Sequence, residues 1–84
     1  MTVFGGALGP DGAHRLPIRV YFEDTDFSGN VYHAAYLKFL ERGRTEYLRA
    51  LDIHHHRLVA EGLVFAVSRL EIDYLRPARI DDLL

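Results

Sequence analysis

Cysteine is absent from the 84-residue chain. Disulfide bonds and thiolate metal sites are therefore excluded, and any metal site would have to be built from histidine and carboxylate side chains. Long apolar runs are absent as well, and none approaches the roughly 20 residues that a membrane-spanning helix needs. The formal net charge is -2 and no basic stripe offsets the acids, which argues against a dedicated nucleic-acid-binding protein.

The composition is that of an ordinary globular protein, because 49% of the residues are hydrophobic and 26% are charged. A chain of this length forms one domain at most. The first residues have neither a basic stretch nor a continuous apolar core, which argues against a secretory signal. We therefore expect a cytoplasmic protein.

Residues 1–14 hold four of the seven glycines. This composition is typical of a flexible leader rather than of a packed element. Residues 15–84 are then expected to form the N-terminal part of a single domain.

Two stretches alternate apolar and polar residues with the period of two of a half-buried strand. They cover residues 16–23 and 63–77, and a further strand begins in the last residues. Between them the apolar period lengthens to three and four residues, which predicts an amphipathic helix from about Tyr32 to Leu51. A second, short helix is predicted to stop at Gly62, a residue type suited to helix ends. Gly43 lies on the apolar side of the long helix, which predicts that a sheet or another helix approaches closely there.

Two strands and one long helix leave the apolar side of that helix poorly covered. Chains this short bury only about 60% of their unfolded surface even when they form a complete domain. The sequence therefore predicts a chain that is truncated at its C-terminus or that takes additional sheet from a partner.

Three carboxylates occupy the four positions that end at Asp26. A turn at Gly29 follows, and then the predicted helix begins near His33. Backbone N–H groups at a helix start lack acceptors and favour negative charge. Such donors stabilise the oxyanion formed when an ester or thioester is hydrolysed, and a carboxylate just upstream can act as nucleophile or general base. The alternative is a solvated loop that caps the helix.

At these residues the sequence resembles a known family. The stretch "VYFEDTDFSGNVYHAAYLKFLERGRTEYLR" is similar to the Tol-Pal-associated acyl-CoA thioesterases of the 4-hydroxybenzoyl-CoA thioesterase family, which are hotdog-fold proteins. The later stretch "EGLVFAVSRLEIDYLRPARIDDLL" also resembles this family. The spacing D-x-x-G-x-V-Y-H, which begins at Asp26, is the most specific part of the match.

The resemblance implies an α+β hotdog fold, in which a curved antiparallel sheet wraps a long central helix, incomplete in this chain. It implies hydrolysis of acyl-CoA thioesters with Asp26 as the catalytic carboxylate and the backbone N–H of His33 polarising the thioester carbonyl. Gly29, Val31 and Tyr32 are the implied substrate-binding residues. It further implies no metal or cofactor, a homodimer or homotetramer, and possible Tol-Pal or lipid-synthesis partners.

Several alternatives stay open at this point. The acid can attack the thioester directly or activate water, and the acyl carrier can be CoA or acyl carrier protein. A non-catalytic acyl-binding or assembly module of hotdog type is the competing function.

Three expectations concern residues near these motifs. Glu23 and Asp24 are expected to be solvated at a strand end, where their charges would raise the pKa of Asp26. The three consecutive histidines that begin at His54 are expected to be a solvated helix start, because consecutive helical residues point about 100° apart and at most two of them could share one ion. Arg76 is a weak candidate for contact with CoA phosphates.

Overall fold

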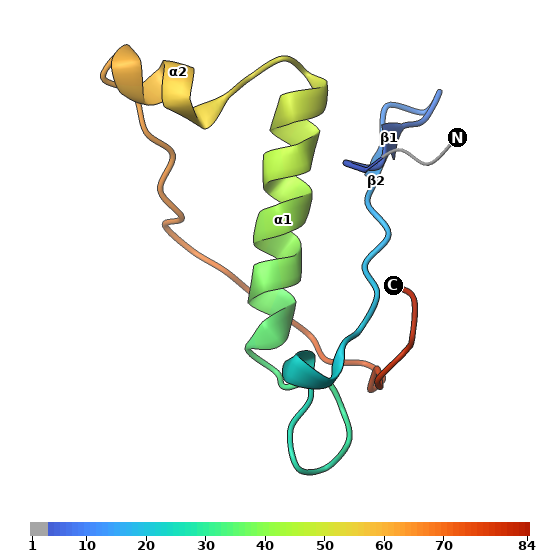
Figure 1. Ribbon diagram of the computed structural model, residues 1–84. Coiled ribbons are helices and arrows are strands. Elements are labelled where there is room, and N and C mark those ends of the chain that lie inside the picture. Colours follow the sequence, from blue (N-terminus) through green and yellow to red (C-terminus); the bar gives the residue numbers. More distant parts are fainter. Residues whose placement is uncertain (1–3) are drawn as a thin grey trace.

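The computed structural model describes residues 4–84, so the first three residues of the expected leader lie outside the described part. In chain order it contains the short strands β1 (Ala7–Leu8) and β2 (His14–Arg15), the 3-10 turn η1 (Phe22–Asp24), and the helices α1 (Ala35–Ala50) and α2 (His55–Ala60). Figure 1 shows α1 as the long central element, with α2 beyond its C-terminal end and the chain between β2 and α1 folded around its N-terminal end.

The long amphipathic helix is confirmed, although α1 begins at Ala35, three residues after the predicted start. The Tyr32 carbonyl accepts a hydrogen bond from the Ala35 N–H at 2.8 Å, so a tight turn precedes the helix proper. Helix α1 buries Ala35 and Phe39 on its apolar side. The short second helix is confirmed as α2, and Gly62 follows it with a φ of 79°, the left-handed conformation that favours glycine.

Part of the expected flexible leader has regular structure. Strands β1 and β2 pair antiparallel, with Ala7 opposite Arg15 and Leu8 opposite His14, and both contact α1. The His14 ring lies 6.1 Å from that of Tyr47 on the helix. This hairpin is therefore packed against α1.

The two longer strands predicted at residues 16–23 and 63–77 are not formed within the described residues. In the first stretch, Ile18 exchanges two backbone hydrogen bonds with Leu84, at 3.0 and 2.8 Å, and the chain then turns into η1. The second stretch is extended, and among the described residues no other segment pairs with residues 64–77 through backbone hydrogen bonds (Figure 1, the orange segment). A strand requires a hydrogen-bonded neighbour, and alternation of side chains does not provide one.

The buried core is small and lies at the N-terminal end of α1. It consists of Val20, Val31, Ala35, Phe39 and Ala78, with two further side chains packed against it. Four parts of the chain contribute: the segment before η1, the loop that precedes α1, the start of α1 and the C-terminal segment. The core thus holds the loop that precedes α1 in place.

The expected close approach at Gly43 is wrong for this structure, because a Cβ atom placed there would have no neighbour within 4 Å. The apolar side of α1 is correspondingly open further along, where Leu40 and Tyr47 are exposed. Among the described residues, no helix is both long enough and apolar enough to span a membrane.

Candidate active site

The loop from Asp26 to Asn30 is closed by its own backbone. The Asp26 N–H donates to the Asn30 carbonyl at 3.0 Å, and the Gly29 N–H donates to the Asp26 carbonyl at the same distance. Gly29 has a φ of 83°, which explains a glycine at this position. A bridge between Thr25 and Val31 joins the two sides of the loop, so its ends lead from η1 into the turn before α1.

The Asp26 carboxylate is held by one residue of this loop. Its Oδ1 accepts hydrogen bonds from the Ser28 N–H, at 2.9 Å, and from the Ser28 hydroxyl. The Ser28 hydroxyl and then the Ser28 N–H lower the pKa of Asp26, burial opposes them, and the nearby His33 lowers it further. Asp26 is therefore ionised at neutral pH. The expectation that neighbouring acids raise the pKa of Asp26 is wrong, because donors to its carboxylate decide the direction.

Asp24 is not a solvated acid, so that expectation is also wrong. Only 4% of the residue is exposed. Its Oδ2 accepts the Tyr21 N–H at 2.9 Å, which closes η1, and its Oδ1 lies 3.8 Å from the Lys38 ammonium on α1. Asp24 thus ties the loop to the helix, whereas Asp26 lies at the surface of the loop.

His33 lies in the turn between the loop and α1. No residue of the described chain accepts a hydrogen bond from its backbone N–H. Its ring lies 4.4 Å from the Tyr32 ring, and its carbonyl accepts a hydrogen bond from the Tyr74 hydroxyl at 2.9 Å. The N–H is thus a donor without an acceptor in the turn before α1, two residues ahead of the first helical residue.

An open cleft of about 290 Å³ brings three of the predicted site residues together. Asp26, Val31 and His33 line it. The other two predicted residues are not among its lining: Gly29 shapes the loop, and Tyr32 lies beside His33 with its ring half-exposed. The cleft therefore holds a carboxylate and the residue that bears the unpaired N–H.

The cleft also includes residues that the sequence alone did not assign to the site. They are Ser28, Asn30, Tyr36, Tyr74, Leu75 and Pro77. For Ser28 a signal was present, since a serine two residues after an aspartate commonly donates to it in a turn. For Tyr74, 41 residues from its partner His33, sequence spacing offers no signal. Arg76 lines the cleft as well.

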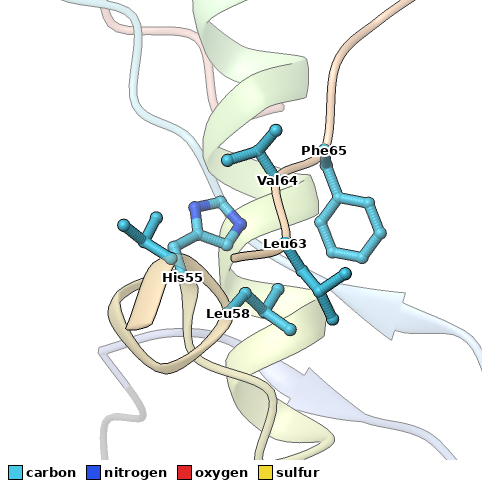
Figure 2. Close-up of a pocket in the computed structure, with 6 residues that line it drawn as sticks. His55, Leu58, Leu63, Val64 and Phe65 are labelled. Atoms are coloured by element: carbon cyan, nitrogen blue, oxygen red, sulfur yellow. The ribbon is translucent and has the colours of Figure 1, made fainter. Parts of the chain in front are cut away.

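A second hollow lies at α2, away from the loop (Figure 2). His55 is its one titratable side chain, and the other lining residues are aliphatic or aromatic, including Leu58 and Phe65. It contains no carboxylate, so it lacks the acid that the predicted mechanism requires. The neighbouring His54 is hydrogen-bonded to Asp52 at 3.0 Å. Within residues 4–84, no three His, Asp or Glu side chains are grouped so that they could hold a metal ion.

Comparison with known proteins identifies the family to which this chain belongs. The model of the family described as "Thioesterase superfamily" matches residues 28–84. The chain belongs to the thioesterase superfamily. The match includes Val31 and His33 and begins two residues after Asp26.

Named relatives agree with this family. The chain is 53% identical over 75 residues to the acyl-CoA thioesterase YbgC of Haemophilus influenzae, covering 88% of this chain and 55% of the relative. It is 51% identical over 74 residues to the acyl-CoA thioester hydrolase YbgC of Escherichia coli O157:H7, covering 83% and 52%. The chain thus spans about half the length of the curated relatives it matches.

A solved structure supports the fold. The crystal structure of a probable thioesterase from Bartonella henselae is 51% identical to this chain and has a TM-score of 0.76, with 81% of this chain and 58% of that one covered. Together with the family match, this confirms the predicted α+β hotdog class. Of that architecture the described residues show the long helix and a small antiparallel sheet.

Proposed function

We propose that the cleft beside α1 is the acid-bearing part of an acyl-CoA thioesterase site, which hydrolyses acyl-CoA to a free acid and CoA. The observation that carries the proposal is that Asp26 and His33 line the same cleft, where Asp26 offers a carboxylate and His33 a backbone N–H without an acceptor. An ionised acid and a backbone N–H donor can together hydrolyse a thioester, the acid as nucleophile or general base and the donor as partner of the oxyanion. Membership in the thioesterase superfamily supports the same reaction.

Two routes use these groups. In the first, an Asp26 oxygen adds to the thioester carbon, the C–S bond breaks to release the CoA thiolate, and water hydrolyses the resulting anhydride. In the second, Asp26 takes a proton from water, the hydroxide adds to the same carbon, and the C–S bond then breaks. Both routes require an ionised Asp26, which its lowered pKa provides.

In either route negative charge develops on the carbonyl oxygen. The proposed partner of that oxygen is the backbone N–H of His33, aided by the positive end of the α1 dipole. Removal of one such donor typically lowers kcat by about 100-fold or more. Val31, Gly29 and Tyr32 are proposed to shape the contact with substrate.

The proposal also covers the substrate, the oligomeric state, the location and the partners of the protein. Relatives of this chain are named as acyl-CoA thioesterases, and one match, at 29% identity, is named as an acyl-acyl carrier protein thioesterase of Arabidopsis thaliana. We propose acyl-CoA as substrate and a homodimer or homotetramer in which sheet from outside these residues covers the open side of α1. A cytoplasmic location and Tol-Pal or lipid-synthesis partners remain predictions.

The decisive experiment is thiol release from short-chain, medium-chain and aromatic acyl-CoAs by the protein and by Asp26→Asn. We expect the variant to lose at least about 100-fold in kcat, because it has no carboxylate to attack the thioester or to activate water. Asp11→Asn is a matched control, since Asp11 is also a loop acid that accepts the N–H of the residue two positions later. It should hydrolyse normally.

A near-normal rate in Asp26→Asn would exclude the assignment. If neither protein hydrolyses any acyl-CoA or acyl carrier protein thioester, yet both bind a non-hydrolysable acyl-CoA thioether, the non-catalytic binding module becomes the better description.

A further inference from the structure

Tyr74 connects the extended segment to the candidate site. Its hydroxyl donates a 2.9 Å hydrogen bond to the carbonyl of His33. From residue 64 to residue 77, this is the one hydrogen bond in the described chain that reaches outside the segment. The contact therefore holds the segment at a single polar point, beside the proposed catalytic groups.

The Tyr74 ring is held in place by the first turn of α1. Its centroid lies 5.6 Å from that of Tyr36, whose ring in turn lies 5.9 Å from the buried Phe39. The Tyr74 ring is also nearly perpendicular to that of His33, with the centroids 6.5 Å apart and an angle of 86° between the ring planes. Aromatic contacts of this kind favour particular relative orientations of the rings. The hydroxyl is thus directed by packing.

The carbonyl that Tyr74 contacts is not used by the helix. In a regular α-helix the His33 carbonyl would accept the N–H of Leu37, but this N–H donates to the Ala34 carbonyl at 3.1 Å. Tyr74 is accordingly the one partner of the His33 carbonyl in the described structure. Without Tyr74, neither the His33 carbonyl nor the Ala34 N–H, which form one peptide group, would have a hydrogen-bond partner in the described structure.

The peptide groups on both sides of His33 are therefore fixed. The group that contains the His33 N–H also contains the Tyr32 carbonyl, which accepts the Ala35 N–H at 2.8 Å. The following group is held by Tyr74. Two planar groups joined at one Cα have only φ and ψ to vary, so holding both fixes the direction of the N–H.

We propose that Tyr74 is a positioning residue for the proposed oxyanion donor: its hydroxyl fixes the peptide after His33 and so keeps the His33 N–H directed at the thioester carbonyl. The inference rests on the proposed function, because the N–H has a catalytic task only in that reaction. Tyr74 itself touches no reacting atom in this scheme. Its contribution is to keep the His33 N–H already oriented, so that this N–H does not have to reorient when negative charge develops on the thioester oxygen.

Tyr74→Phe tests the proposal, since it removes the hydroxyl and keeps the ring. We expect kcat to fall about tenfold with KM changed less than about twofold, because a transition-state contact is loosened while ground-state binding is kept. The acid limb of the pH profile should not move, because the Ser28 donors to Asp26 stay in place. Tyr47→Phe is the matched control: Tyr47 is on α1, and its hydroxyl has no hydrogen-bond partner in residues 4–84.

A second measurement needs neither a variant nor activity. In the wild-type protein, the Tyr74 hydroxyl proton should exchange with solvent at least about tenfold more slowly than the Tyr47 hydroxyl proton, as measured by NMR. Equal exchange rates would show that the contact with His33 is not formed in solution and would overturn the proposal.

The two proposals fail in different ways. If Asp26→Asn abolishes hydrolysis while Tyr74→Phe retains full kcat, only the role of Tyr74 is refuted. If Asp26→Asn is as active as the wild type, the proposed function is refuted. The positioning role of Tyr74 then falls with it, and slow exchange of the Tyr74 hydroxyl proton reports a structural contact only.

Discussion

Asp24 and Asp26 are two residues apart and have opposite surroundings. Asp24 is buried and closes η1 by accepting the Tyr21 N–H, with Lys38 nearby. Asp26 lines the cleft, where Ser28 donates to it twice. A buried carboxylate with fixed partners serves the fold, whereas an ionised carboxylate in a cleft is available for chemistry.

Ser28→Ala should raise the pKa of Asp26 toward its ordinary value. The hydroxyl stabilises the ionised form and is the largest cause of the lowered pKa, so its removal favours protonation. The group must be ionised to react, so the acid limb of the kcat/KM profile should move to higher pH. A pH-rate profile, with an NMR titration of the Asp26 carboxyl, checks this.

Ser68→Ala is the control for this prediction, because Ser68 lies exposed in the extended segment. An unchanged acid limb in Ser28→Ala would mean that the backbone N–H alone sets the pKa of Asp26 or that another group controls the profile.

At the scale of the helices, Gly43 and Gly62 differ in backbone conformation and therefore in whether alanine could replace them. Gly43 lies inside α1 with open space around it, and Gly62 ends the turn after α2 with a φ of 79°. A helix interior favours alanine over glycine by about 1 kcal/mol, whereas the left-handed conformation penalises any Cβ by about 1–2 kcal/mol.

Gly43→Ala should therefore raise the free energy of unfolding by about 1 kcal/mol, and Gly62→Ala should lower it by a similar amount. Urea denaturation monitored by circular dichroism measures both. A destabilised Gly43→Ala would mean that backbone from another strand or another copy packs on this side of α1 in solution.

At the scale of the whole molecule, much apolar surface is uncovered. The extended segment exposes large side chains along its length: Leu63, Val64, Phe65, Val67, Leu70, Tyr74 and Leu75. Exposed apolar surface joined to unpaired strand-like backbone is suited to pairing with another chain.

We expect the protein to associate, as a homodimer or homotetramer, through this segment. Leu70→Asp should weaken association at least about tenfold, since burying one leucine contributes about 1.5–3 kcal/mol. Sedimentation at several concentrations measures this, with Val59→Asp on α2 as the control. A monomer at every concentration, or equal weakening by both variants, would contradict the prediction.

The sequence was informative where a structure depends on neighbours along the chain. The helical period located α1, and Gly62 indicated where α2 ends. The order of acid, glycine turn and helix start predicted that Asp26 and His33 lie near each other, and both line one cleft. It failed at residues 16–23 and 63–77, because a strand depends on a partner that alternation cannot supply. It also failed at Gly43, because packing against a helix depends on distant parts of the chain.

The sequence by itself determined the two helices and the tight Gly29 loop, since turn residues and helical periodicity act over a few positions. The family came from the resemblance of the stretch around Asp26 to known thioesterases, and the family match agrees with it. Only the tertiary structure decided which acid is buried and which lines the cleft, because Lys38 reaches Asp24 from α1. It alone joined Tyr74 to His33 across 41 residues. Long-range contacts form where the folded chain brings backbone and side chains together, and no local pattern records them.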